Sequence, residues 1–257
     1  MITLLNGEQW NEQDILKKMD DDSFYYGHLG QHALSSSLLK PILKSPKAFL
    51  KAKNESDDKQ AYRDGRLIHL NILEEHKLND LVIIEGTKAT KAYKEAVQEY
   101  GSSMVYTKSE YDNAFFTSKA IKDCDEAMEL LQGCDFEVPA IGTIDGLPIR
   151  AKADAIKGKT IIDLKTTGDI SKWTKSARWF DYNLQAALYL ELFQADMFIF
   201  LVLDKDTKDI GIFDCSTEFI EEGYNKLNRA IANYKYWFQE NPDPRTAINN
   251  FVIRDVV

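Results

Sequence analysis

The sequence predicts a mixed α/β domain in which helices flank a central mixed sheet. Short β-prone runs separated by turn residues extend from Phe136 to Lys165, and the apolar run from Met197 to Leu203 is typical of a buried strand. Helical periodicity dominates the segments before, between and after these runs. We therefore expect one domain over 1–257, with a helical N-terminal part at 1–133 and the core at 134–240.

Helices are expected through the N-terminal part. Ser35–Ser37 supply hydroxyl groups in front of an apolar helical pattern, and Pro46 can open a further helix that runs to Lys53. After the polar break from Asn54 to Lys59, another helix carries Gly65 and His69. A last helix is predicted from Ser109 to Leu131, with Gly133 where a C-terminal cap would lie.

The core begins with a predicted three-stranded antiparallel meander. Asp145-Gly146 is a strong two-residue hairpin signal, and Lys157-Gly158-Lys159 marks the second turn. The pattern then predicts a helix at Tyr182–Gln194 and a buried strand at Met197–Leu203. A turn at Asp204–Asp209 and a short strand at Ile210–Asp214 follow. The last predicted element is a helix that is capped by Ser216 and ends near Glu240.

Composition excludes several classes of protein. The chain has 32 Lys and Arg against 41 Asp and Glu, a net charge of -9, which argues against a DNA-coating protein but allows an enzyme with a local basic lining. Its 3 cysteines include no close pair, which argues against a disulfide framework or a zinc knuckle. The longest apolar run is too short for a bilayer helix and no signal peptide is recognisable, so we expect a cytoplasmic location.

Charged side chains follow a two-residue period along two of the predicted strands. Lys152 and Asp154 share one strand face with Arg150, and Asp163 and Lys165 share a face of the next strand. If the turn at Gly158 pairs these strands, the two aspartates lie close enough to share a divalent cation, which would keep both ionised. Hard oxygen ligands favour Mg²⁺ or Mn²⁺, and a neighbouring lysine can orient water or stabilise a phosphate. The alternative is an amphipathic strand that presents its polar face to solvent.

Three motifs in order resemble those of one nuclease family. Asp154 followed by Asp163-Leu164-Lys165 resembles the PD-(D/E)XK signature, although Ala153 stands where the motif has proline and Asp163 where it often has glutamate. Gln185 and Tyr189 resemble the downstream QxxxY motif, and the segments Gly65–His69 and Leu73-Glu74 resemble the upstream histidine motif. Together the motifs resemble the exonuclease VIII (RecE-type) family, which is related to bacteriophage lambda exonuclease. The resemblance implies a PD-(D/E)XK nuclease core.

The resemblance also implies roles for individual residues. Asp154, Asp163 and the backbone carbonyl of Leu164 would bind a first Mg²⁺, with His69 near a second ion, and Mn²⁺ could substitute. Lys165, Gln185 and Tyr189 would complete the catalytic set with the two aspartates, and Glu137 would lie near the metals. The residues alone leave other interpretations open. His69 can be a hydrogen-bonded residue at the core boundary, and Gln185 and Tyr189 can serve helix packing.

Two segments are candidates for DNA contact. Lys40 and Lys44, with Lys47, follow Ser35–Ser37 and could meet phosphates, or they could form a solvated face. Cations and aromatic residues alternate just after the second acidic strand, a mixture suited to an unpaired strand end or to a subunit contact: Lys172, Trp173, Lys175, Arg178 and Trp179.

The family resemblance implies a magnesium-dependent exonuclease that degrades double-stranded DNA from its ends in the 5'-to-3' direction, in phage-type recombination. It implies a homo-oligomeric ring, a tetramer or trimer, and a single-strand annealing protein as partner. Two alternatives stay open. One is another PD-(D/E)XK enzyme, an endonuclease or repair nuclease, and the other is a catalytically silent protein that binds DNA ends.

Overall fold

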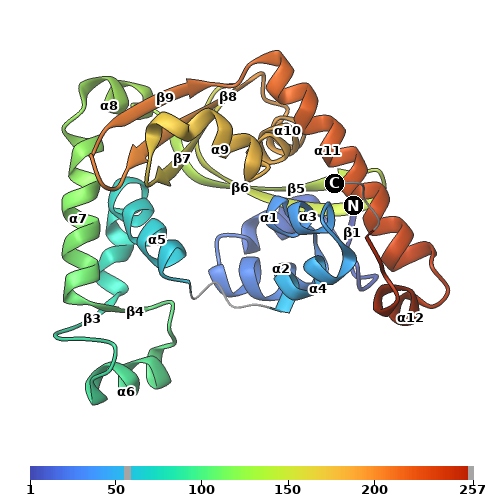
Figure 1. Cartoon of the computed structure of the whole chain (residues 1–257), viewed down its shortest axis with the longest axis horizontal. Helices are drawn as coiled ribbons and strands as arrows, with labels where there is room; N and C mark the ends of the chain where they lie inside the picture. The colour runs from blue at the N-terminus through green and yellow to red at the C-terminus, as the bar shows by residue number, and fades with distance from the viewer. Residues whose placement is uncertain (55–58, 254–257) are drawn as a thin grey trace.

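A computed structural model describes residues 1–54 and 59–253 and has a five-stranded mixed sheet at its centre (Figure 1). The strand order follows the chain, and every neighbouring pair is antiparallel except β7 and β8, which run parallel. The predicted mixed sheet with its antiparallel meander is confirmed. Its strands are β5 (Asp135–Ile144), β6 (Leu147–Lys157), β7 (Thr160–Thr167), β8 (Met197–Asp204) and β9 (Ile210–Asp214).

The turns of the meander have the backbone that their residues favour. Asp145 and Gly146 both have positive φ, 47° and 77°, which matches the right-handed twist of the flanking strands in a two-residue hairpin. Gly158, at φ 59°, turns the chain from β6 into β7. The parallel pairing of β7 with β8 needs a crossover, and helices α9 and α10 lie between these strands in the chain.

Alternate residues of the strands build two cores on opposite faces of the sheet. Phe198, Phe200 and Val202 of β8 pack in one core, and Ile199 and Leu201 pack in the other. The first core is covered by α3 (Ser36–Ile42), α4 (Pro46–Asn54), α9 (Trp173–Trp179), α10 (Tyr182–Phe193) and α11 (Thr217–Lys235). The second is covered by α5 (Gln60–Leu73), α7 (Lys108–Lys122) and α8 (Asp125–Leu131).

The predicted helix from Ser109 to Leu131 is two helices. The first helix ends at Lys122, Cys124 has an extended backbone, and α8 starts at Asp125. The first helix begins at Lys108, one residue earlier than expected, because Thr107 and Glu110 form a reciprocal capping box. Gly133 has positive φ, 75°, after the second helix.

The N-terminal part also contains short strands that the sequence pattern does not reveal. Residues 1–33 form a small layer against Ile141 of β5. It consists of β1 (Ile2–Thr3), β2 (Gln9–Trp10), α1 (Glu12–Lys18), a π-helical segment η1 (Ser23–His28) and α2 (Leu29–His32). The predicted polar break at 54–59 falls largely on 55–58, which lie outside the described residues.

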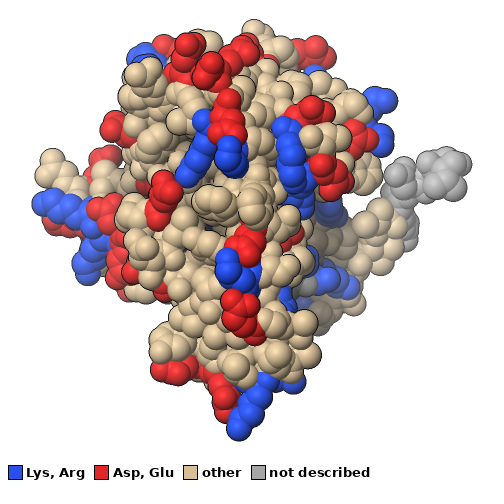
Figure 2. All heavy atoms as spheres, turned by 90° about the vertical axis from the view of Figure 1, so that its left-hand side faces the viewer, with Lys and Arg blue, Asp and Glu red and all other residues tan. Residues whose placement is uncertain are grey.

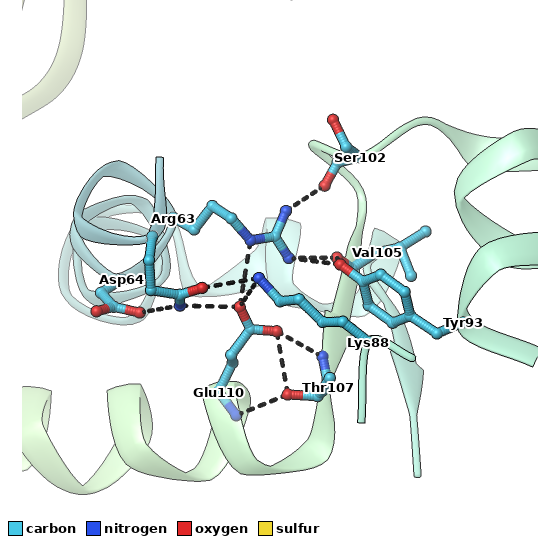
Figure 3. A network of polar contacts seen from close by, with 9 residues as sticks. Arg63, Asp64, Lys88, Tyr93, Ser102, Val105, Thr107 and Glu110 are labelled. Atoms are coloured by element: carbon cyan, nitrogen blue, oxygen red, sulfur yellow. Dashed lines mark hydrogen bonds and ion pairs between the residues drawn. The ribbon is translucent and has the colours of Figure 1, made fainter. Parts of the chain in front are cut away.

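Residues 82–107 form an arm beside α5, at the lower left of Figure 1. It is built from β3 (Val82–Ile84), α6 (Lys91–Tyr100) and β4 (Val105–Thr107), and η2 (Glu75–Asp80) leads into it. Arg63 of α5 attaches the arm (Figure 3): its guanidinium donates to the backbone oxygens of Ser102 and Val105 and to Glu110. Arg63 is 4% exposed, so this buried cation fixes the arm against the helix that carries His69.

The C-terminal helices close the first face. Ser216 caps α11 as predicted, and the helical path continues to Glu240 through the π-helical segment η4 (Tyr236–Glu240) before α12 (Pro244–Asn249). A three-residue 3₁₀ turn, η3 (Ile170–Lys172), precedes α9. Gly223 of α11 lies directly against α10, where an added Cβ would stand 2.1 Å from the backbone oxygen of Asn183. Over the residues that the structure describes, no helix is long and apolar enough to cross a membrane.

Candidate active site

Strands β6 and β7 part where the acidic residues lie. Their regular pairing ends with Ala155 opposite Ile162, and Asp154 and Asp163 are the next residues along the two strands. The Asp154 carboxylate accepts the backbone N–H of Leu164 at 2.8 Å. The hairpin thus places the aspartates at adjoining positions, and the backbone of β7 orients one of them.

Asp154 lies beside two other potential metal ligands. Nδ1 of His69, on α5, lies 3.7 Å from Oδ2 of Asp154, and ligand atoms of His69, Glu137 and Asp154 all lie within 4.8 Å of one another. Within the described ranges, this is the one such group of three or more. Glu137 lies on β5 between the pairs Phe136 with Ala155 and Val138 with Ala153, so it stands opposite Asp154. Its φ of 51° is unusual for a residue with a side chain.

Asp163 lies next to this group and is held by two other residues. Its side chain is 1% exposed, Oδ1 accepts a 2.7 Å hydrogen bond from Nε2 of Gln185, and Oδ2 forms an ion pair with Lys165. Burial raises the pKa of Asp163, and the Lys165 ammonium offsets only part of this effect. Oδ2 contacts the Lys165 ammonium, and a carboxylate oxygen has a second lone pair that can take a further ligand.

Two lysines share the ring of Tyr182 on α10. Nζ of Lys40 lies 4.6 Å and Nζ of Lys165 5.1 Å from the ring centroid. Burial, followed by repulsion from Lys165, lowers the pKa of Lys40 to about 7. Burial alone would lower the pKa of Lys165 too, but the Asp163 and Asp154 carboxylates raise it. Lys165 is therefore a charged donor at the edge of the site.

The donor set suits a hard divalent cation. Two carboxylates and an imidazole converge, and the Asp163 carboxylate lies on the adjoining strand position. Burial, with the nearby Asp154 and Glu74 carboxylates, raises the pKa of Glu137 to about 8. So many acidic groups at close range are compatible with full ionisation only if a cation neutralises them. The site thus includes Glu137 beside the residues singled out by the motifs.

The two residues of the QxxxY motif differ in their surroundings. Gln185 joins Asp163 to Lys40, whose Nζ lies 3.3 Å from Oε1. Tyr189 is 8% exposed in the first core, and its hydroxyl donates to the backbone oxygen of Lys152 at 3.2 Å. The packing interpretation describes Tyr189: it anchors β6 two residues before Asp154.

Arg150 and Lys152 form a cationic row on β6 leading to Asp154. Both side chains stack on Tyr25 of η1, at 4.3 and 4.7 Å from the ring centroid, and Lys152 also pairs with Asp22 at 3.3 Å. The two-residue period of the strand indicates this row in the sequence, but the segment that contains Tyr25 carries no such signal.

Some of the expected DNA-contacting residues are turned inward and others are exposed. Trp173 is 3% exposed and packs on Phe200 and Tyr182, so its indole has no free face for a base. In the same segment Trp179 is 78% exposed, Lys175 is exposed, and Arg178 pairs with Glu222 at 3.1 Å. Lys44 is exposed, whereas Lys40 turns inward to Gln185.

Figure 2 shows the face formed by α7, α8 and the arm. Acidic and basic side chains are interspersed there, without a continuous basic stripe. A surface with interspersed charges does not favour binding of a nucleic acid's phosphate backbone. The cations near the site are instead those of β6, β7 and α3.

Comparison with known proteins places the chain in a family. A family described as a PDDEXK-like domain of unknown function (DUF3799) matches residues 35–250. The chain belongs to this PDDEXK-like family. The resemblance drawn from the motifs around Asp154, Asp163 and Lys165 is thereby confirmed at the level of the family.

A solved structure similar to this PDDEXK-like chain supports the same fold. A chain from Eubacterium rectale described as a "Putative exonuclease" is 17% identical, with a TM-score of 0.63 over 98% of this chain and 97% of its own. A phage-related exonuclease from Haemophilus somnus 129PT is also 17% identical, with a TM-score of 0.36 over 81% of this chain and 96% of its own. No curated protein matches the sequence.

Proposed function

We propose that the protein is a divalent-metal-dependent nuclease that hydrolyses phosphodiester bonds at the ends of double-stranded DNA. One observation carries the proposal: His69, Glu137 and Asp154 converge within 4.8 Å beside a buried Asp163 that is paired with Lys165. Family membership and the name of the Eubacterium rectale structure support it.

Each residue of the site has a separate proposed role. His69, Glu137, Asp154 and Asp163 would hold the cation, with the carbonyl of Leu164 as a further ligand. When bound, such a cation supplies Lewis-acid assistance to the phosphoryl group. Lys165, held charged by Asp163, would donate to a phosphoryl oxygen or orient the attacking water. Gln185 would keep Asp163 in place, and Lys44, Lys175 and Arg178 would contact the DNA backbone.

The finer assignment is also part of the proposal. We infer Mg²⁺ as the physiological cation, with Mn²⁺ as a substitute and two ions in the complete site. We infer 5'-to-3' polarity, a ring of three or four copies and a single-strand annealing protein as partner. These inferences rest on the resemblance to the exonuclease VIII family.

The decisive experiment compares linear and closed circular duplex DNA. The full-length protein is incubated with end-labelled linear DNA or with the circle, in Mg²⁺ and then in chelator. We expect Mg²⁺-dependent loss of the linear DNA alone, starting at its 5' ends. Cutting of the circle would indicate an endonuclease instead. Retention of DNA without cleavage in Mg²⁺ and in Mn²⁺ would indicate a silent end-binding protein.

A variant of Asp163 tests the site itself. Asp163→Ala and Asp163→Asn should each lower kcat by roughly 100-fold or more, as loss of one essential charged group does. Asp196→Asn removes an exposed carboxylate that pairs with Lys159, and it should leave kcat unchanged. Circular dichroism and thermal unfolding would confirm that the variants fold. Unchanged kcat in folded Asp163→Ala would refute the assigned site.

A further inference from the structure

We propose that Lys40 is a positioning residue that fixes the side-chain amide of Gln185 in the one orientation that presents its NH₂ group to Asp163. Lys40 would then act on the chemistry through Gln185 and Asp163, rather than as a phosphate contact. The kinetic part of this inference rests on the proposed nuclease function, whereas its structural part does not.

The orientation of the amide follows from the hydrogen-bonding capacity of its neighbours. A lysine ammonium can only donate, and an ionised carboxylate can only accept. Oε1 of Gln185 lies 3.3 Å from Nζ of Lys40, and Nε2 lies 2.7 Å from Oδ1 of Asp163. A flipped amide would turn its NH₂ group toward an ammonium and its oxygen toward a carboxylate. Both contacts would become repulsive, so Lys40 and Asp163 together permit one orientation.

The environment of Lys40 gives it no simpler structural role. Among the residues that the structure describes, no carboxylate forms an ion pair with Lys40, and its nearest polar partner is Gln185. Its ammonium instead lies over Tyr182, on the same ring as Lys165. A half-buried lysine beside a second lysine is unfavourable for stability. Burial and Lys165 accordingly lower the pKa of Lys40 to about 7. Its position is better explained by the amide that it orients.

Loss of Lys40 would affect the reaction through the position of the Asp163 carboxylate. Gln185 occupies Oδ1 and Lys165 pairs with Oδ2, so the carboxylate plane is fixed by both contacts. Without Lys40 only Asp163 restrains the amide, so the amide can turn more freely and its hydrogen bond to Oδ1 is held less firmly. Misplacement of Asp163 would slow the chemical step and leave DNA affinity largely intact. A phosphate contact would instead raise KM.

The structural part is tested by NMR on the full-length protein without metal or DNA. The side-chain NH₂ resonances of Gln185 are assigned by their loss in Gln185→Ala. Lys40→Met, which keeps the length of the side chain, should shift or broaden these resonances, and Lys40→Arg should leave them close to their original position. Lys91→Met is the control, because Lys91 is 88% exposed on the arm and pairs only with Glu95 among the described residues. Unchanged Gln185 resonances in Lys40→Met would overturn the inference even if no nuclease activity is found.

The kinetic part is tested by a double-mutant cycle on duplex cleavage. Lys40→Met should lower kcat roughly tenfold with KM within about twofold, Lys40→Arg should recover most of kcat, and Lys91→Met should match the wild type. In the Gln185→Ala background, Lys40→Met should have no further effect on kcat. If Lys40→Met lowered kcat as much in the Gln185→Ala background as in the wild type, Lys40 would not act through Gln185. An effect of Lys40→Met confined to KM would lead to the same conclusion. A wild-type protein that fails to cleave DNA would refute the proposed function, and the NMR result alone would then decide the role of Lys40.

Discussion

Glu137 combines three properties that an ordinary strand residue lacks. Its backbone is left-handed, its carboxyl meets His69 and Asp154, and burial with neighbouring carboxylates raises its pKa to about 8. A residue with a side chain in this conformation costs about 1 kcal/mol or more of strain. Buried acidic neighbours add to the cost. Both effects destabilise the folded state, so we infer that the carboxyl is retained for the site rather than for the fold.

This interpretation predicts opposite effects on stability and cation binding. Glu137→Gly should stabilise the protein by about 1 kcal/mol, because glycine adopts positive φ freely, while Mn²⁺ binding weakens at least several-fold. Asp145→Gly is the control, since Asp145 has φ 47° in the β5–β6 turn of the same hairpin and lies outside the ligand group. It should stabilise the protein without changing Mn²⁺ affinity. Urea denaturation and titration calorimetry measure the two quantities, and equal Mn²⁺ affinity in Glu137→Gly would exclude Glu137 as a ligand.

The sequence predicts the position of a residue where the spacing along the chain permits only one local structure. Asp154, Asp163 and Lys165 are recognisable because a short hairpin turn forces their strands together. Glu137 has no periodic signal, since it joins the group through a backbone conformation that no pattern encodes. Trp173 shows what composition leaves open: cations surround it in the chain, yet its ring packs inward on Phe200. Local composition does not tell which side of a short helix is buried.

At the scale of elements, two helix glycines have contrasting surroundings. A Cβ added to Gly65 of α5 would meet only Oγ1 of Thr166 at 4.0 Å, an ordinary contact. A Cβ added to Gly223 of α11 would overlap the backbone oxygen of Asn183, which belongs to α10 and cannot retreat. Gly223 therefore permits the close approach of α11 to the helix that carries Gln185, whereas Gly65 only weakens its own helix.

Alanine at the two positions should therefore change stability in opposite directions. Gly65→Ala should stabilise the protein by up to about 1 kcal/mol through helix propensity, and Gly223→Ala should destabilise it by roughly 2 kcal/mol through overpacking. Chemical denaturation followed by circular dichroism measures both. If Gly223→Ala were as stable as the wild type, the close contact of α10 with α11 would not exist in solution.

Elements are predictable in proportion to their length and regularity. The meander, β8 and α10 follow from hairpin residues, an apolar run and a long periodic segment. The strands β1 to β4 have only two or three residues each, too few for any period to show. The break between α7 and α8 was missed because Asp123 and Cys124 interrupt the apolar pattern no more than ordinary surface residues do.

At the scale of the whole molecule, charge is arranged locally rather than in bulk. The net charge is -9, yet four cations gather near the acidic group on β6, β7 and α3: Arg150, Lys152, Lys165 and Lys40. Interspersed charges cover the face of α7 and α8 (Figure 2). An anionic substrate would therefore be attracted to the site and not to that surface. Bulk composition could not reveal this, because it does not report position.

The Glu110 carboxylate links several of the groups that attach the arm to the core. Glu110 accepts hydrogen bonds from Arg63, Lys88, Gln60 and the backbone N–H of Thr107 (Figure 3). Burial alone would raise the pKa of Glu110, but the Thr107 N–H and the three side chains lower it to about 2. Because the folded pKa lies below the ordinary value of 4.5, the carboxylate stabilises the fold fully above about pH 4.5. That contribution is lost as the pH falls toward 2.

Glu110→Gln should therefore reduce stability in a pH-dependent way. At pH 6 we expect the variant to be less stable than the wild type by about 2 kcal/mol, as for the loss of charged hydrogen bonds. At pH 2 most of this difference should have vanished, because the pH has then reached the folded pKa and the wild-type protein has lost most of the same contribution. Glu95→Gln, an exposed partner of Lys91 on α6, should show no such difference at either pH. Urea denaturation at the two pH values measures the difference, and a constant gap between wild type and Glu110→Gln would mean that the charge of Glu110 does not hold the arm against α5.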